Sequence, residues 1–233
     1  SVYKPRDKMP STRMGTAALI RETLVKAQNY LEKQAKAIED PDKDPPDEDL
    51  KLEAVALALR GEIQARVHAH RADDLLTALR LGEEFGLQVV VEHCTEGHKV
   101  AEELVGAGVP ALVGPTLGSR GKVELRELSF ATSGELARAG VTVALISDHP
   151  FVPIQYLPLC GGLAIREGLD EGTALRAMTL TPAEILGVAD RVGSLVPGKD
   201  ADLTIYKGHP FHDVQARCRL TMIQGQVVYE NWS

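Results

Sequence analysis

The sequence lacks a long apolar run, an excess of positive charge and a paired cysteine motif. None of its apolar segments approaches the about 20 residues that a membrane-spanning helix requires, so no membrane anchor is expected. The first residues, Ser1 to Arg6, are polar, unlike a secretory signal peptide. The formal net charge is −7, which argues against nucleic acid or an anionic membrane as the main partner.

The three cysteines, Cys94, Cys160 and Cys218, are odd in number and far apart. No C-x-x-C spacing occurs, so we expect a reduced, cytoplasmic compartment. Cys94 directly follows His93. A small apolar residue near a strand end is the favoured interpretation of Cys94, and a soft metal ligand is the alternative.

The chain has 233 residues, of which 44% are hydrophobic, enough for one sizeable domain with an appendage. Residues 1–62 are predicted to form a helical segment. Its first helix runs from about Met14 to Ala37, with Ser11 or Thr12 as the N-cap. A charged, proline-broken loop over 39–47 separates it from a second helix over 48–60.

From residue 63 to residue 192 the pattern changes to alternating strands and helices, which predicts a parallel sheet. The expected strand over 87–93 is nearly continuously apolar, which indicates that both of its faces are covered. Asp73 or Asp74 is expected to cap the first of the helices. The expected strands cover 65–70, 87–93, 110–114 and 141–147, and the expected helices cover 73–85, 98–107, 133–139, 157–167, 171–180 and 182–186.

Residues 193–233 have a third character. Three short segments rich in β-branched and aromatic residues, 202–206, 220–223 and 227–229, are predicted to be antiparallel strands. Gln224-Gly225 is the expected hairpin turn. His209 and His212 lie in this tail without a partner pattern and are interpreted as surface residues.

Three of the strand-like segments end in a potential metal ligand: His68, His93 and Asp148. The carboxyl ends of parallel strands share one edge of a β/α barrel, where such barrels carry their sites. Imidazole nitrogen and carboxylate oxygen suit zinc and similar divalent ions. Period-two alternation puts His70 on the same face as His68. His70 is therefore a candidate to support a metal ligand by hydrogen bonding or to contact substrate.

Two passages resemble the amidohydrolase superfamily, especially its imidazolonepropionase-like members. The first runs through Thr181–Gly187 and Gly193–Leu203, and the second is Ser147-Asp148-His149-Pro150. The resemblance implies an α/β fold: a partial (β/α)8 TIM barrel of about strands 5–8, over residues 63–192. It further implies that residues 193–233 are the C-terminal strands of a small β-sandwich domain.

The resemblance also implies roles for individual residues. His68 matches the metal ligand of the fifth strand, and His93 matches the histidine of the sixth, which binds metal or substrate. Asp148 matches the eighth-strand residue that binds metal and takes a proton from the attacking water. Arg71 stands where imidazolonepropionases carry an acid, which argues against imidazolone ring opening itself. Arg71 and Arg120 are candidate contacts for a substrate carboxylate, with a solvated loop arginine as the alternative for each.

The family's first-strand His-x-His pair and its fourth-strand lysine have no match before His68. A complete barrel needs about 250 residues, so strands one to four are expected to lie outside this chain. The fifth strand would then be an exposed edge. We expect it to be covered by a missing N-terminal half or by a second copy in a homo-oligomer.

The sequence therefore predicts an enzyme, a hydrolase that acts on non-peptide C–N bonds by metal-activated water. The expected substrate is a small cyclic amide, amidine or N-acyl compound. The expected cofactor is Zn²⁺, with iron or manganese as alternatives. The competing hypothesis is a non-catalytic amidohydrolase-like partner or scaffold without a complete metal site.

Overall fold

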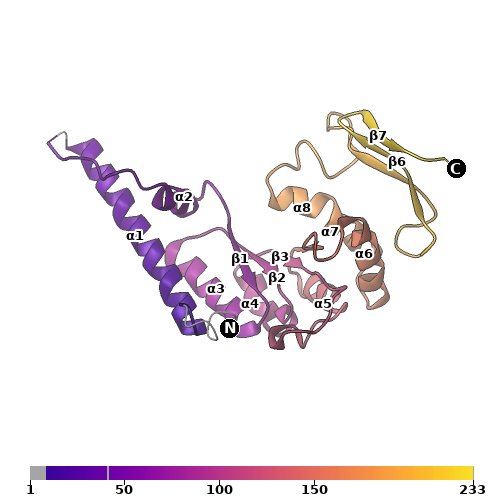
Figure 1. The fold of residues 1–233 in the computed structure, drawn as a ribbon, viewed down its shortest axis with the longest axis horizontal. Helices are drawn as coiled ribbons and strands as arrows, with labels where there is room; N and C mark the ends of the chain where they lie inside the picture. The colour runs from indigo at the N-terminus through magenta and orange to yellow at the C-terminus, as the bar shows by residue number, and fades with distance from the viewer. Residues whose placement is uncertain (1–8, 41, 233) are drawn as a thin grey trace. The chain divides into compact units, whose positions relative to one another are not determined.

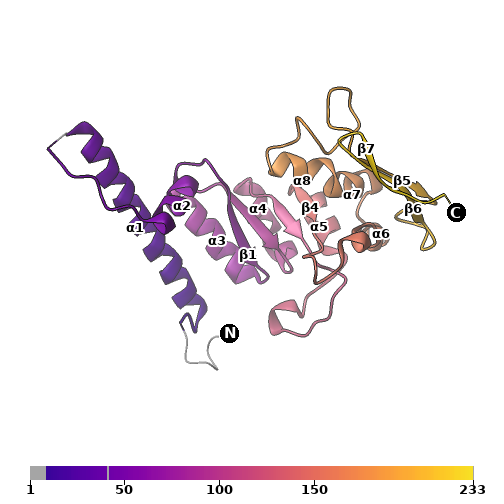
Figure 2. The same ribbon diagram turned by 45° about the horizontal axis from the view of Figure 1, so that its top comes forward.

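The protein is described by a computed structural model that covers residues 9–40 and 42–232. Figures 1 and 2 show its helices and strands in chain order. The described residues form two compact units, one made of those within 1–67 and 73–90 and the other of those within 68–72 and 91–233. The division into segments 1–62, 63–192 and 193–233 stays a prediction.

The first unit contains α1 (Arg13–Glu39), α2 (Leu50–Leu59) and nearly all of α3 (Ala72–Phe85). The N-cap of α1 is Thr12, one of the two expected residues, whose side chain accepts a hydrogen bond from the backbone N–H of Gly15. Asp49 caps α2 in the same way, because its side chain accepts from the backbone N–H groups of Lys51 and Leu52.

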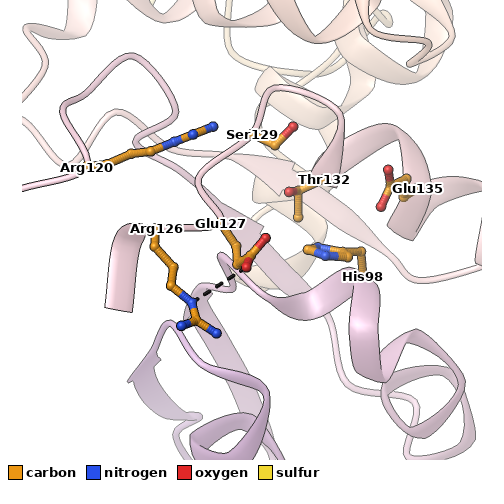
Figure 3. Close-up of a pocket in the computed structure, with 7 residues that line it drawn as sticks. All are labelled: His98, Arg120, Arg126, Glu127, Ser129, Thr132 and Glu135. Carbon is orange, nitrogen blue, oxygen red and sulfur yellow. Dashed lines mark ion pairs between the residues drawn. The ribbon is translucent and has the colours of Figure 1, made fainter. Parts of the chain in front are cut away.

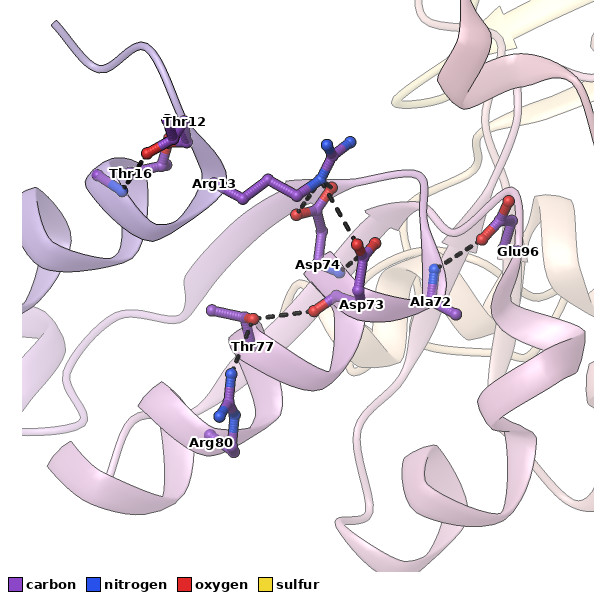
Figure 4. Close-up of polar contacts among 10 residues, drawn as sticks. Thr12, Arg13, Thr16, Ala72, Asp73, Asp74, Thr77, Arg80 and Glu96 are labelled. Carbon is purple, nitrogen blue, oxygen red and sulfur yellow. Dashed lines mark hydrogen bonds and ion pairs between the residues drawn. The ribbon is translucent and has the colours of Figure 1, made fainter. Parts of the chain in front are cut away.

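The start of α3 differs from the prediction. The helix begins at Ala72, so Asp73 and Asp74 lie in its first turn and neither is the cap. Acidic side chains in a first turn still complement the positive end of the helix dipole. Arg13 Nε lies 3.0 Å from the carboxylate of Asp74 and 3.7 Å from that of Asp73 (Figure 4). These side chains are largely exposed, so each pair contributes at most about 1 kcal/mol.

Apolar contacts among the three helices form the core of the first unit. Leu24 of α1 packs with Leu81 and Phe85 of α3, and all three side chains are buried. Val55 and Leu59 of α2 pack against this cluster. Burial of apolar surface here stabilises the helices more than the exposed ion pairs do.

The main sheet has four strands, β1 (Ala65–Ala69), β2 (Val89–His93), β3 (Ala111–Val113) and β4 (Val143–Leu145). They lie in the order β1-β2-β3-β4, and the pairings of β2 with β3 and of β3 with β4 are parallel. Every residue of β3 and β4 is buried, as expected for strands covered on both faces. The predicted parallel sheet is confirmed.

One helix of the second unit is broken where the sequence predicts a continuous one. A single helix is expected over 98–107, but Val100, with φ −135° and ψ 29°, separates a 3₁₀ turn from an α-helix. The helices predicted over 171–180 and 182–186 are separate, and Thr179, with φ −130° and ψ −83°, divides α7 from α8. The helical elements are η2 (Gly97–Val100), α4 (Ala101–Gly106), η3 (Val123–Leu125), α5 (Thr132–Ala139), η4 (Ile154–Tyr156), α6 (Leu157–Arg166), α7 (Glu171–Met178) and α8 (Leu180–Ile185).

The C-terminal strands form a separate antiparallel sheet. Its strands β5 (Leu203–Lys207), β6 (Arg217–Ile223) and β7 (Gln226–Glu230) lie in that order. Gln224 and Gly225 both have positive φ, 49° and 77°, as a type I′ hairpin turn requires. The predicted turn is therefore confirmed. Among the described residues, no helix combines the length and the apolar character that a membrane span requires.

Replacement of Leu81 by Ala should destabilise the first unit. The Leu81 side chain is 6% exposed and packs among Leu24 and Phe85, so truncation leaves a cavity between α1 and α3. The expected loss is about 2–5 kcal/mol in the free energy of unfolding, measured by urea denaturation. Leu50→Ala is the matched control, because Leu50 is 76% exposed and should change stability little. Equal losses in the two variants would contradict this packing.

Candidate metal centre

Three histidines meet at the carboxyl ends of β1 and β2. His68 lies within β1, His70 follows its last residue, and His93 is the last residue of β2. Alternation along the extended chain places His68 and His70 on one face. One ring nitrogen from each of the three lies within 4.8 Å of the others, and the Nε2 atoms of His68 and His70 are 3.1 Å apart.

The three imidazole rings are in direct contact. The centroid of His68 lies 4.1 Å from that of His93 and 4.9 Å from that of His70, and the His70 and His93 rings stack at 4.7 Å. His70 and His93 are buried, whereas His68 is exposed. The group is therefore open to solution on the side of His68.

The orientation of His93 is set by a backbone carbonyl. Its Nδ1 lies 2.7 Å from the carbonyl oxygen of Gly114, at the end of β3. A carbonyl can only accept, so Nδ1 carries the proton and donates. This leaves the lone pair of Nε2 available, which is the arrangement that orients histidine ligands in metal sites.

His70 is held by a side chain. Its Nδ1 lies 2.9 Å from the hydroxyl of Thr95, and both residues are buried. The hydroxyl donates or accepts, so this contact fixes the ring position but not the tautomer.

Burial lowers the pKa of both histidines at the end of β1. For His70 the pKa falls from 6.5 to about 4, first through desolvation and then through the charges of His93, His68 and Lys122. The pKa of His68 is also lowered, with desolvation and then His93 as the main causes. Both imidazoles are therefore neutral at pH 7. A divalent metal requires neutral imidazole, so this donor set fits such an ion.

The backbone around the site adopts the left-handed conformation at three residues other than glycine. The φ angles are 71° at His93, 47° at Cys94 and 52° at Asp148. Such angles are uncommon outside glycine and gather at functional sites. The Cys94 side chain itself is buried, which raises the pKa of its thiol to about 12. The thiol stays protonated, as expected of an apolar residue rather than of a thiolate ligand.

The remaining predicted residues are not members of the three-histidine group. Asp148 is exposed in the turn after β4, and its carboxylate is not a member of the described ligand group. Its role in metal binding and proton transfer stays a prediction. Arg71 directly follows His70 and is half-buried.

Arg120 lines a polar pocket of about 300 Å³ (Figure 3). One of its guanidinium nitrogens donates to the carbonyl oxygen of Leu128 at 2.8 Å, which holds the side chain in place. An ion pair of 3.6 Å joins Arg126 and Glu127 on the same wall. The pocket is lined by His98, Arg120, Arg126, Glu127, Ser129, Thr132 and Glu135.

Sequence reasoning missed the residues that hold the histidines, namely Thr95 and Gly114, and a buried acid beside them, Glu96. The Glu96 carboxylate is 5% exposed and accepts a hydrogen bond from the backbone N–H of Ala72 at 3.0 Å (Figure 4). Burial raises its pKa, but the bond from Ala72 and the charge of Lys99 outweigh this and lower it. The signal in the sequence is the polar pair Thr95-Glu96, which follows a buried strand and Cys94.

These features define an α/β protein with a candidate three-histidine metal site at one edge of its parallel sheet. The sequence profile described as "Amidohydrolase family" matches residues 19–229. The chain belongs to the amidohydrolase family, and the predicted resemblance is confirmed.

Curated relatives show the same relationship. The chain is 28% identical to amidohydrolase tasK of Hapsidospora irregularis over 221 residues, which cover 90% of this chain and 22% of that protein. It is 43% identical to imidazolonepropionase of Geobacillus kaustophilus over 79 residues, 33% of this chain and 19% of that protein. The chain thus spans about a fifth of the length of either relative.

Solved structures resemble most or nearly all of the chain. An amidohydrolase from Thermotoga maritima MSB8 matches with a TM-score of 0.94 and 43% identity, covering 99% of this chain and 60% of that one. An adenosine deaminase from Xanthomonas campestris matches with a TM-score of 0.56 and 24% identity, over 77% of this chain and 48% of that one. The second match bears on the fold alone.

His70→Gln should make the stability of the metal-free protein less dependent on pH. The folded-state pKa of about 4 lies below the ordinary value of 6.5, so between these values the unfolded chain binds more protons. Stability therefore falls as pH is lowered from about 6.5 to about 4, and the variant lacks this contribution. Urea midpoints across this range measure how steeply stability depends on pH. Part of this dependence remains in the His70→Gln variant, because the pKa of His68 is lowered as well.

The control for this experiment is His149→Gln, which replaces an exposed imidazole in the turn after β4. It should keep the full slope. The account of a desolvated His70 is wrong if His70→Gln and the unchanged protein lose stability equally on acidification.

Gly114→Ala should damage both stability and metal binding. Gly114 has φ 138°, and a Cβ there would lie 2.1 Å from the carbonyl oxygen of Ile146, which as backbone cannot give way. The expected loss is about 1–3 kcal/mol of unfolding free energy. Zinc affinity should fall as well, because the carbonyl that orients His93 moves.

Gly106→Ala is the matched control, since a Cβ at this position in α4 meets no atom within 4 Å. It should be neutral or stabilising by up to about 1 kcal/mol. Calorimetric titration with zinc and urea unfolding of both variants measure the difference. A Gly114→Ala protein with unchanged affinity would show that the carbonyl does not position His93.

Proposed function

We propose that this chain carries about strands 5–8 of a (β/α)8 barrel, followed by β-sandwich strands, and serves in metal-dependent hydrolysis of non-peptide C–N bonds. Membership of the amidohydrolase family and the parallel sheet support the proposal. The names of the relatives tasK and imidazolonepropionase support a hydrolase of this kind.

The observation that carries the proposal is the contact of three imidazoles at one sheet edge, with the ring of His93 oriented by the Gly114 carbonyl. His68, His70 and His93 would hold a divalent ion, with zinc as the expected metal and iron or manganese as alternatives. When bound, such an ion supplies Lewis acidity, which lowers the pKa of a water molecule towards ~7. In this proposal His70, expected from the sequence to contact substrate, joins the ligands.

Asp148 is the proposed proton carrier. Its carboxylate accepts a proton from the attacking water and delivers it to the nitrogen that leaves when the C–N bond breaks. Its exposed position after β4 leaves it accessible to substrate. Arg71 and Arg120 are proposed to hold a substrate carboxylate through charge-assisted hydrogen bonds. The substrate class is a small cyclic amide, amidine or N-acyl compound.

A non-catalytic scaffold is the second candidate. It is favoured by one feature of the described residues: the group of three histidines contains no carboxylate, and Asp148 lies outside it. Association with a missing N-terminal half, or with a second copy that covers the exposed fifth strand, stays a prediction from the sequence. Metal content separates the two functions, because a scaffold that has lost its site holds no zinc, iron or manganese at these histidines.

Replacement of His93 by Gln should remove one equivalent of zinc from the dialysed protein, because the oriented Nε2 is lost. His149→Gln, the control, should retain it. Elemental analysis of zinc per chain measures the difference. Hydrolysis of a panel of cyclic amides, amidines and N-acyl compounds should require the metal, and Asp148→Asn should lower kcat by about 10² to 10⁴ with zinc retained.

Equal zinc content in the His93→Gln and His149→Gln proteins would refute the three-histidine site. Zinc bound at the histidines, together with the same turnover in the Asp148→Asn protein, would refute the role of Asp148 alone.

A further inference from the structure

A second cluster of metal-ligand side chains lies away from the three histidines. Glu171, the first residue of α7, lies beside His209 and His212 from the loop between β5 and β6. One ligand atom from each lies within 4.8 Å of the others. The Nε2 atoms of His209 and His212 are 3.2 Å and 2.7 Å from the two carboxylate oxygens of Glu171.

The two histidine rings are arranged to act together. Their centroids are 4.6 Å apart and their planes are inclined by 30°, so both Nε2 atoms face the same carboxylate. A tight turn produces this arrangement, since the backbone N–H groups of His212 and Asp213 both donate to the carbonyl oxygen of His209. All three ligand side chains are exposed, which gives an ion direct access from solution.

The loop that carries the histidines is packed closely against α6. At Gly162 a Cβ would lie 2.2 Å from the carbonyl oxygen of Phe211, so only glycine permits this approach. The ring of Phe211 also lies within contact distance of a Cβ at Gly161. Phe211 lies between His209 and His212 in the chain, so this contact fixes the loop in the position that brings both rings to Glu171. Little loop ordering is then required for an ion to bind.

We propose that Glu171, His209 and His212 form a second divalent-metal site, suited to Zn²⁺, that ties the loop between β5 and β6 to α7. Two imidazoles and a carboxylate are a recognised zinc donor set, and three protein ligands leave a position for water. The site shares no residue with the three-histidine centre, so it goes beyond the proposed hydrolase function and stands independently of it.

Without a metal ion, both imidazoles contact the Glu171 carboxylate directly. The backbone N–H of Phe211 donates to Nδ1 of His209 over a long 3.3 Å, which leaves Nε2 to donate to Glu171. For an ion to bind at the two Nε2 atoms, the proton of each imidazole would move from Nε2 to Nδ1, and at His209 the long contact with the backbone N–H of Phe211 would be given up. The ion would then replace the contacts of both imidazoles with the carboxylate.

The test is the number of zinc ions per chain in variants that separate the two sites. The protein with His209→Gln and His212→Gln should hold one equivalent fewer than the unchanged protein, and the His149→Gln control should hold the same number. In a His68→Gln, His93→Gln background, added zinc should still raise the Tm, because an ion that binds only the folded state stabilises it. That rise should disappear when His209→Gln is added.

Glu171→Gln keeps the size of the side chain but removes its charge, so zinc affinity should fall by about tenfold or more. Replacement of His68 and His93 would leave this second ion in place. Failure of the hydrolase proposal would therefore leave zinc bound at Glu171, His209 and His212, whereas failure of this proposal would leave no zinc there. The proposal would be overturned if zinc content and the Tm response to zinc were the same with and without His209 and His212. The cluster would then be held by hydrogen bonds alone and would bind no metal.

Discussion

The hydrogen bond from Nδ1 of His93 to the carbonyl oxygen of Gly114 joins the ends of β2 and β3. It fixes both the rotation of the imidazole ring and the nitrogen that carries the proton. His68 and His70 contribute rings from β1. All three rings can bind one metal ion only when Nε2 of His93 presents its lone pair. Gly114 can supply this carbonyl because its backbone adopts φ 138°. At this position any side chain would clash with the carbonyl oxygen of Ile146.

The left-handed conformations at His93 and Cys94 follow from the same need to orient the His93 ring. Each costs of order 1–3 kcal/mol and persists only where the surroundings hold it. Val89, Val90 and Val91 anchor β2 in the core, and a Cβ at Gly97 would lie 2.3 Å from Sγ of Cys94. The chain therefore turns sharply out of the sheet immediately after a buried strand. This turn brings Thr95 to His70 and Glu96 to the backbone of Ala72.

Much of this arrangement could be predicted from the sequence. Short strand-like segments ending near His68 and in His93 predicted strands of a parallel sheet with potential metal ligands at their carboxyl ends, and Gln224-Gly225 predicted the hairpin of the tail. The supporting residues could not be predicted, because the contacts of Thr95, Glu96 and Gly114 depend on loop dihedral angles that periodicity does not encode. His209 and His212 showed no partner pattern, since His212 meets Glu171 across 41 positions of sequence.

The most direct measurement is X-ray absorption at the zinc edge of zinc-loaded protein. The protein should carry His209→Gln and His212→Gln, so that the second cluster binds no zinc and adds nothing to the spectrum. Imidazole nitrogen ligands are expected at about 2.0–2.1 Å. Their number should fall by one in a protein that additionally carries His93→Gln. A spectrum with oxygen ligands alone, or one that His93→Gln leaves unchanged, would contradict the three-histidine centre.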